Sequence, residues 1–175
     1  MRVFRRAVPM ASGLQASLEE WRRVLDVNIA GSFIFAKLVA PGMIAQRYGR
    51  IVNIGSLAGR TVPLIAGPHY AASKAGLVGF TRAAARDLAP HGITVNCVAP
   101  GRILTRMTEP LESEANRAAL ARIPVGRIGR PEEIADAVAF PGIRSGCIRY
   151  GNDNRRQRRR IRKLRRRTML WLSSG

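Results

Sequence analysis

The sequence predicts an α/β fold built on a parallel sheet. Two observations carry this prediction: helical and strand patterns alternate along residues 17–140, and both strand candidates are short, continuous apolar runs rich in β-branched residues. Strands of that kind are buried on both faces, as in parallel sheets covered by helices. With 175 residues, the chain is long enough for one domain with a sizeable core.

The first helix is expected to begin at Ser17. Ser17 followed by Glu20 is a capping-box pattern, and apolar residues then recur at helical spacing towards Gln46. Proline lacks a backbone N–H and clashes with the preceding turn. We therefore predict one helix over 17–46 that Pro41 kinks or splits in two.

Two strands and two helices are expected next. The run "RIVNIGS" (50–56) and the run "ITVNCVAPG" (93–101) are predicted to be buried strands. Between them, a helix is predicted over 70–88, because a Pro and a Gly follow that end its pattern. A last helix is expected over 130–140, with Pro131 in its first turn.

The stretch "GPHYAASKAGLVGF" (67–80) places a tyrosine one helical turn before a lysine. A tyrosine hydroxyl loses its proton only near pH ~10, and a nearby cation stabilises the phenolate. Tyr70 and Lys74 lie at i and i+4 on one helix face, so they could exchange a proton with a carbonyl oxygen. Ser56 and the Pro100-Gly101 pair follow the two strands, where parallel sheets gather their sites.

Three segments in this order resemble the classical short-chain dehydrogenase/reductase family: "LDVNIAGSF", "RIVNIGSLAG" and "YAASKAGLVGFTRAAARDLAPHGITVNCVAPG". Within that family the wording is similar to the 3-oxoacyl-acyl-carrier-protein reductases and related bacterial dehydrogenases. The resemblance covers about residues 14–140. It implies a partial Rossmann-like doubly wound parallel sheet and an NAD(P)-dependent oxidoreductase acting on a carbonyl/alcohol pair, such as a 3-oxoacyl thioester.

The resemblance implies a role for each matching residue. Tyr70 would be the general acid/base, with Lys74 tuning it and holding the nicotinamide ribose. Ser56 would polarise the substrate carbonyl, and Asn28 would anchor a water in the proton relay. Cofactor contacts are implied for Tyr70, Lys74, Pro100, Gly101, Ile103 and Thr105.

Purely structural roles stay open beside these. Asn28 could satisfy a helix kink, Ser56 could terminate its strand, and Thr105 could cap the next segment. His69 and His91 have no metal-ligating partner at suitable spacing and are taken as loop residues, so no metal site is expected. A stripe of small residues could be internal packing or a pairing face between subunits: Ala71, Ala72, Ala75, Gly79 and Ala83.

The implied cofactor is NAD or NADP. No Gly-rich turn for its pyrophosphate occurs in the sequence, and neither does the residue that selects NAD from NADP. We therefore expect residues 1–140 to be the catalytic half of the family's fold, N-terminally truncated by roughly three strand–helix units. Such a fragment is expected to be inactive alone.

Residues 141–175 have a different composition. They carry 12 basic residues and one acidic residue, whereas residues 1–140 carry 18 and 10. We expect a disordered or irregular Arg-rich tail. One back-translation of residues 140–159, with one base removed from the Pro141 codon, reads FLASDRAAYVTATITVDNGG, which resembles the family's ending. The tail is therefore interpreted as a frameshift product.

Two other functions are kept open. The run 155–167, with ten basic residues among thirteen, could bind nucleic acid or another anionic surface, at least non-specifically. The chain could also be a catalytically dead partner of intact relatives, which are expected to be homo-oligomers. No stretch was judged long and apolar enough for a membrane span, because Lys37 and Pro41 interrupt the best candidate. Cys97 and Cys147 are expected to be incidental thiols of a cytoplasmic protein.

Overall fold

The computed structural model describes residues 14–63, 66–108, 113–139 and 146–149, the last four as backbone only. The strands are β1 (Gly49–Ile54), β2 (Ile93–Ala99) and β3 (Gly146–Arg149). The helices are α1 (Leu18–Leu25), α2 (Gly31–Gln46), α3 (Pro68–Leu88), α4 (Glu114–Leu120) and α5 (Pro131–Ala139).

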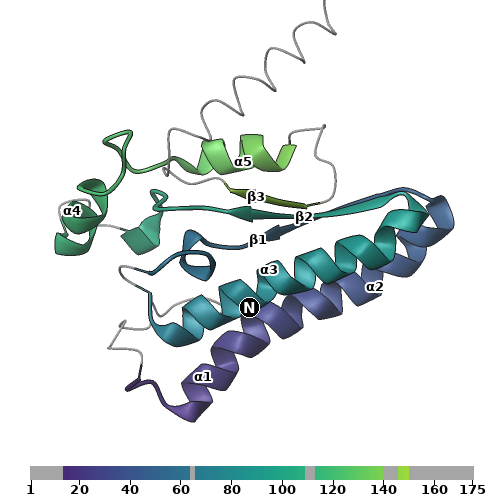
Figure 1. Cartoon of the computed structure of the whole chain (residues 1–175), viewed down its shortest axis with the longest axis horizontal. Helices are drawn as coiled ribbons and strands as arrows, with labels where there is room; N and C mark the ends of the chain where they lie inside the picture. Colours follow the sequence, from purple (N-terminus) through teal and green to yellow (C-terminus); the bar gives the residue numbers. More distant parts are fainter. Residues whose placement is uncertain (1–13, 64–65, 109–112, 140–145, 150–175) are drawn as a thin grey trace, which may run out of the picture.

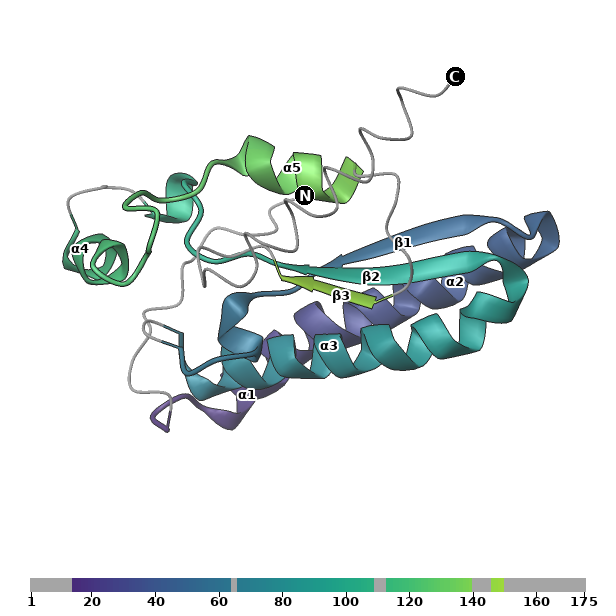
Figure 2. The same cartoon turned by 45° about the horizontal axis from the view of Figure 1, so that its top comes forward.

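The three strands form one parallel sheet in the order β1-β2-β3. Helices α2 and α3 lie side by side on one face, and α5 lies on the other (Figures 1 and 2). Helices on both faces of a parallel sheet define the α/β class, so the predicted fold is confirmed. The predicted strands and the helices over 70–88 and 130–140 all form, with ends shifted by a few residues.

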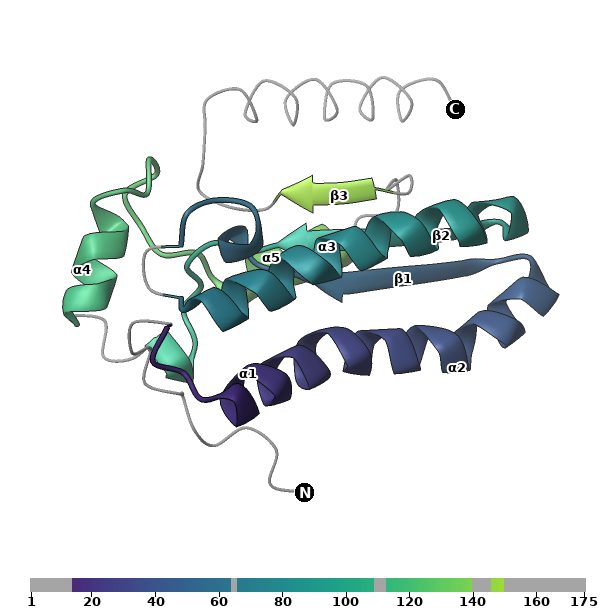
Figure 3. The same cartoon turned by 60° about the horizontal axis from the view of Figure 1, so that its bottom comes forward.

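The core is centred on β2, the middle strand of the described sheet. Ile93 and Val95 are at most 1% exposed, and the strand's last three residues are fully buried. On one face, α3 supplies a stripe that recurs every four residues, as one side of a helix does: His69, Ser73, Leu77, Thr81 and Ala85. Figure 3 shows α3 running along the sheet in this position.

The long N-terminal helix is interrupted at a different place from the one predicted. Ser17 caps α1 by accepting a hydrogen bond from the Glu20 backbone amide, as expected. A π-helical turn, Asp26–Ala30, then separates α1 from α2. Pro41 was predicted to kink the helix or to split it in two, and a split at Pro41 is wrong, because α2 continues through it. The chain accommodates the interruption three turns earlier, around Asn28.

By length and composition alone, the helical run Leu18–Gln46 could cross a membrane. The prediction that Lys37 and Pro41 rule out a membrane span here is wrong by this criterion. None of the residues of α1 or α2 is buried in the structure. Helix α2 is therefore an apolar helix in which no residue is buried by the described part of the chain.

The strand β3 was not predicted. It lies in the segment expected to be disordered or irregular, and it pairs in parallel with β2 over four residues. Its register sets Cys147 opposite Cys97, so the two cysteines that are far apart in sequence occupy paired positions on neighbouring strands. The remaining residues of the Arg-rich tail, including 155–167, lie outside the described ones.

Candidate active site

Lys74 is the anchor of the candidate site. Its Nζ donates a hydrogen bond of 3.0 Å to the carbonyl oxygen of Ile54, the last residue of β1. Burial lowers the pKa of the Lys74 ammonium, and the nearby Cys97 thiol works in the opposite direction. A lysine with a depressed pKa, held at a strand end, is a feature that functional sites show more often than ordinary surfaces do.

Tyr70 lies one helical turn before Lys74, as the spacing predicted. The two residues belong to the first turns of α3, and Lys74 Nζ lies 5.6 Å from the centroid of the Tyr70 ring. The tyrosine itself is partly exposed. The cation therefore approaches the aromatic ring while the ring remains accessible from outside.

Ser56 reaches the same region from the end of β1. It precedes a 3₁₀ turn, Leu57–Gly59, and its Oγ accepts a hydrogen bond of 3.2 Å from the Ala58 amide. Ser56 therefore caps the turn that follows β1. This capping does not exclude a second role, because a hydroxyl that accepts one bond can still donate its proton.

Gly59 explains how this turn comes so close to α3. A Cβ at Gly59 would lie 2.5 Å from the Lys74 carbonyl carbon and 2.6 Å from the Ala75 nitrogen. Any side chain would collide with the helix backbone. On its other side, the turn is fixed by the Leu57 amide, which donates to the carbonyl of Pro100 at 2.8 Å. The ends of β1 and β2 and the start of α3 therefore meet at Ser56.

Asn28 joins the site from the π-helical turn. Its Nδ2 donates to Ser73 Oγ at 2.9 Å, and Ser73 Oγ donates to the Tyr70 carbonyl at 2.8 Å. Asn28 was predicted within a continuous helix. Its place in a π-helical turn is a correction, and such turns are frequent at functional sites. Ser73 was not among the residues predicted for the site.

The segment predicted to contact the cofactor divides into two parts. Pro100 and Gly101 follow β2 directly and lie beside the Ser56 turn. Ile103 instead pairs with Gly129, and the Leu104 amide donates to the Gly129 carbonyl. Thr105 is exposed in the turn beyond. Its backbone is held by the Thr108 hydroxyl, so Thr108 and not Thr105 provides the capping side chain.

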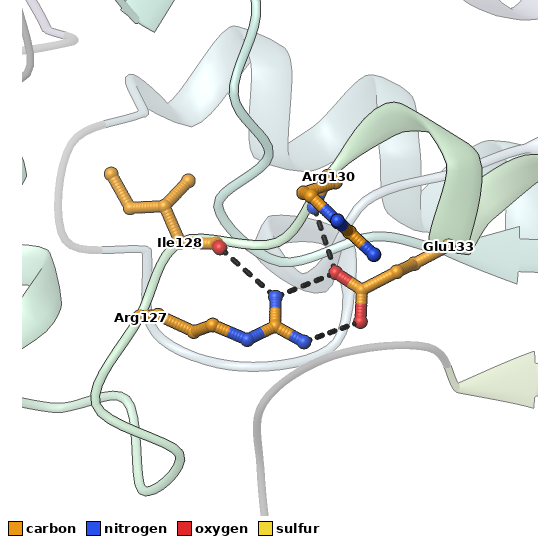
Figure 4. A network of polar contacts seen from close by, with 4 residues as sticks. All are labelled: Arg127, Ile128, Arg130 and Glu133. Atoms are coloured by element: carbon orange, nitrogen blue, oxygen red, sulfur yellow. Dashed lines mark hydrogen bonds and ion pairs between the residues drawn. The ribbon is translucent and has the colours of Figure 1, made fainter.

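An ion pair braces the loop that carries Gly129 (Figure 4). The Arg127 guanidinium donates to both Glu133 oxygens at 2.7 and 2.8 Å, and the Arg130 amide donates at 2.8 Å. These bonds lower the pKa of the Glu133 carboxyl to about 2, with the Arg127 side chain the largest cause. The same glutamate lies in the first turn of α5, where a negative charge is favourable.

His69 is a buried helix residue, so its interpretation as a loop residue is wrong. It is only 6% exposed, directly before Tyr70, and its Nε2 lies 4.0 Å from Glu20 Oε1 on α1. The four-residue period of the stripe on α3 could have revealed this burial. Among the described residues, no group of three or more His, Cys, Asp or Glu side chains is placed to hold a metal ion.

The small-residue stripe of α3 is a surface feature. Ala72, Ala75, Gly79 and Ala83 are exposed, whereas Ala71 is only partly so. Internal packing is therefore wrong for four of the five residues. A Cβ added at Gly79 would meet nothing within 4 Å.

Comparisons with known proteins agree with this arrangement. A family model described as enoyl-(acyl carrier protein) reductase matches residues 6–140. The 3-oxoacyl-[acyl-carrier-protein] reductase FabG of Vibrio cholerae is 48% identical over 122 residues, which are 70% of this chain and 50% of the relative. The chain thus spans about half the length of the curated relatives it matches.

Solved structures give the same picture. A 3-oxoacyl-[acyl-carrier protein] reductase from Brucella melitensis with bound NAD matches with a TM-score of 0.72 and 36% identity, over 79% of this chain and 53% of that one. A candidate 2-deoxy-d-gluconate 3-dehydrogenase from Agrobacterium tumefaciens with bound NADP matches with a TM-score of 0.75 and 34% identity, over 82% and 61%. Neighbours of this fold therefore include proteins that bind either cofactor.

Proposed function

Because the chain belongs to the short-chain dehydrogenase/reductase family, we propose that residues 14–139 carry the proton-transfer half of an NAD(P)-dependent oxidoreductase. The reaction moves hydride between the nicotinamide and a carbonyl/alcohol pair. The substrate class is a 3-oxoacyl thioester, after the names of the matching reductases. The observation that carries the proposal is the anchored Lys74, whose ammonium is tied to the end of β1 and lies over the Tyr70 ring.

The proposed chemistry follows from the residues around Lys74. The Tyr70 hydroxyl gives its proton to the carbonyl oxygen of the substrate, or takes it back from the alcohol. Lys74 stabilises the phenolate that this transfer leaves. The Ser56 hydroxyl donates a hydrogen bond to the same carbonyl oxygen, which stabilises the charge that develops there. Asn28 orients the helix turn from which Tyr70 acts.

The residues at the end of β2 fit the nicotinamide end of such a cofactor. Gly101 has no Cβ to keep a flat ring away from the backbone, Ile103 offers a partly exposed apolar side chain, and the Thr105 hydroxyl is exposed. The Lys74 ammonium has three donors, so it can donate to ribose hydroxyls while it keeps its bond to the Ile54 carbonyl. When bound, the cofactor supplies or accepts the hydride. Whether NAD or NADP binds is part of the test below.

The test uses a chimera, because the chain spans half of its relatives. Residues 14–139 replace the matching segment of the Vibrio cholerae reductase, and oxidation of NADH and NADPH is measured with a 3-oxoacyl thioester. We expect activity with one or both cofactors. Tyr70→Phe should lower kcat by roughly 10²–10⁴-fold, the usual contribution of a positioned acid/base.

Tyr48→Phe is the matched control. Tyr48 is 61% exposed and stacks against Arg50, away from the site. Its substitution should leave activity unchanged. A folded chimera that transfers no hydride, or one in which Tyr70→Phe remains fully active, would refute the proposal. The separate expectation that the 175-residue chain alone is inactive is tested by the same assay on that chain.

A second part of the proposal concerns partners. The exposed small residues of α3 would let the helix of a second copy approach closely, so we propose that the face of Ala72, Ala75, Gly79 and Ala83 pairs subunits. Ala75→Glu should dissociate the oligomer in sedimentation experiments. Arg122→Glu, an exposed position after α4 and away from this helix, is the control. Equal sedimentation of Ala75→Glu and the unaltered chain would contradict this role.

We also propose that residues 141–175 are no part of the catalytic unit and arise from a frameshift. The family model ends at residue 140, where the composition changes. The test is the nucleotide sequence: the alternative frame after codon 140 should encode a β-branched strand followed by Gly-Gly. Any nucleic-acid binding through 155–167 should then be non-specific, weaken steeply with salt and vanish when 150–175 are removed.

A further inference from the structure

We propose that Ser73 is a positioning residue for Tyr70. Its hydroxyl accepts a hydrogen bond from the π-helical turn and donates one to the backbone carbonyl of the tyrosine. The inference rests on the proposed role of Tyr70 as acid/base, and it deepens that role. The residue is separate from the groups assigned to the substrate or the cofactor. It acts through the helix turn that carries Tyr70.

The hydrogen bonds run in one direction. Asn28 Nδ2 donates to Ser73 Oγ at 2.9 Å, and Ser73 Oγ donates to the Tyr70 carbonyl oxygen at 2.8 Å. Ser73 is 0% exposed, so water cannot replace either partner. Loss of the hydroxyl would leave the Asn28 amide without this acceptor and would release the Tyr70 carbonyl from this bond.

The contact beside Ser73 supports the same coupling. One turn along α3, a Cβ at Gly76 would lie 2.7 Å from Ile29 Cδ1. The π-helical turn therefore packs directly against α3 with an apolar side chain next to the Asn28 bond. Because the extra residue of a π-helical turn shifts the phase of the helix, it determines which side chains of this turn face α3.

Together with Lys74, Ser73 fixes the start of α3 at two points. Lys74 ties it to the sheet through the Ile54 carbonyl, and Ser73 ties it to the helix layer through Asn28. Tyr70 lies one turn before both attachments. A helix held at two points cannot rotate about either one, so the direction of the Tyr70 Cα–Cβ bond is set before any substrate binds.

The same helix contains a matched arrangement that does not involve Tyr70. Asn53 Nδ2 donates to Thr81 Oγ1 at 2.9 Å, and Thr81 Oγ1 donates to the Leu77 carbonyl at 2.7 Å. Thr81 is also 0% exposed. Removal of either hydroxyl should cost comparable stability, because each deletes a buried, doubly bonded group. Only the loss of the Ser73 hydroxyl should change the environment of the Tyr70 side chain.

The experiment reads the Tyr70 ring directly in the full 175-residue chain. The protein is labelled with ¹³C in the rings of its tyrosines, of which there are three. Tyr70→Phe identifies the Tyr70 signals by their loss. Ser73→Ala should shift and broaden these signals and leave those of Tyr48 unchanged, while Thr81→Val should leave both unchanged. Unchanged Tyr70 signals in Ser73→Ala, or an equal change in Thr81→Val, would overturn the inference.

Two further variants distinguish a local effect on Tyr70 from a general loss of folding in Ser73→Ala. Asn28→Asp keeps the size of the side chain and removes its donor, so it should shift the Tyr70 signals as Ser73→Ala does. Ser73→Thr keeps the hydroxyl and should preserve the signals. In a double-mutant cycle, Asn28→Asp should add little once Ser73 is alanine. Independent, additive shifts from the two substitutions would argue against the proposed hydrogen-bond chain.

Kinetics of the chimera supply a second readout. Ser73→Ala should lower kcat by roughly 10- to 100-fold with KM unchanged, the order of loss produced by a small misplacement of a reacting group. A fall in substrate affinity with unchanged kcat would count against a positioning role. If no variant transfers hydride, the proposed function fails, and the ring signals still decide whether Ser73 positions Tyr70.

Discussion

Helices α2 and α3 lie on the same face of the sheet, yet only α3 is buried. Six residues of α3 are buried, whereas α2 has none. The difference does not follow composition, because α2 is the more apolar of the two: its Phe35 and Leu38 are 73% and 71% exposed. Burial instead follows the strand beneath, since α3 covers β2, the middle strand of the described sheet, and α2 covers β1 at its border.

A groove of about 380 Å³ separates α2 from β1, on the side of the sheet face where packing is looser. Its lining includes Phe35, Val39 and Ile51, side chains that would ordinarily be buried. The candidate site lies on the α3 side of the molecule, at the ends of β1 and β2. Tyr70 and Lys74 therefore belong to the helix that packs on β2, whereas the exposed apolar surface belongs to α2.

The largest expected loss of stability comes from a substitution in the buried face of α3. Leu77 is 2% exposed, and Leu77→Ala should lower the free energy of unfolding by about 2–5 kcal/mol, through lost burial and the cavity left behind. Leu38→Ala should change it by less than about 0.5 kcal/mol, because Leu38 is already mostly in water. Urea unfolding followed by circular dichroism measures both. Equal losses would show that α2 is packed in solution as firmly as α3.

The next largest change in stability is expected from substitutions of Gly59 and Gly79, which have opposite surroundings. Gly59→Ala should cost about 1–3 kcal/mol, because the new methyl group meets the backbone of α3. Gly79→Ala adds the same group in open space on that helix, and it should stabilise the protein by about 0.5–1 kcal/mol. Thermal unfolding of the two variants provides the measurement. A neutral Gly59→Ala would mean that the Ser56 turn does not press against Lys74.

The ion pair before α5 should contribute less. Glu133→Gln should lower stability at neutral pH by about 0.2–1 kcal/mol, since Arg127 is 55% exposed and solvent screens the pair. The folded-state pKa of Glu133 lies below its usual value of 4.5, at about 2. The contribution is therefore complete above about pH 4.5 and disappears as the pH falls through about 2. Denaturant unfolding of both proteins across this range should show the difference between them closing towards acid.

The smallest effect on stability concerns the uncovered helix. Replacing Phe35 and Leu38 together by serine should change the free energy of unfolding by less than about 0.5 kcal/mol. It should nevertheless lower the binding of a hydrophobic dye such as ANS, because these are the two most exposed large apolar side chains of α2. Ala45→Ser on the same helix is the control. Undiminished dye binding would place the apolar patch elsewhere.

The sequence was sufficient for the parts of the molecule governed by local pattern. Continuous β-branched runs identified β1 and β2, and the Ser17 cap and Pro131 marked two helix starts. The YxxxK spacing brought Tyr70 and Lys74 to one helix face, because that contact depends only on helical geometry. Ser56 and Pro100 could be placed together because ends of neighbouring parallel strands meet.

Features that depend on contacts between elements were missed. The π-helical turn at Asn28 reflects packing against Ser73 and Gly76, and helix patterns carry no signal for it. Pro41 also does not end its helix, since α2 continues through it to Gln46. The strand β3 has a weak local pattern and forms by pairing with β2. Gly59 matters only because α3 passes beside it.

The position of β1 at the border of the described sheet has a practical consequence. Among the described residues, no strand pairs with the outer edge of β1, so its backbone amides and carbonyls can pair with an extended chain. The exposed apolar side chains of α2 would stabilise such a contact. In a cell that expresses the protein, newly made copies would then associate with one another through these exposed surfaces. Yield should fall as expression becomes faster, and slow, cold induction or co-production of a protective chaperone should recover more of the polypeptide in dispersed form.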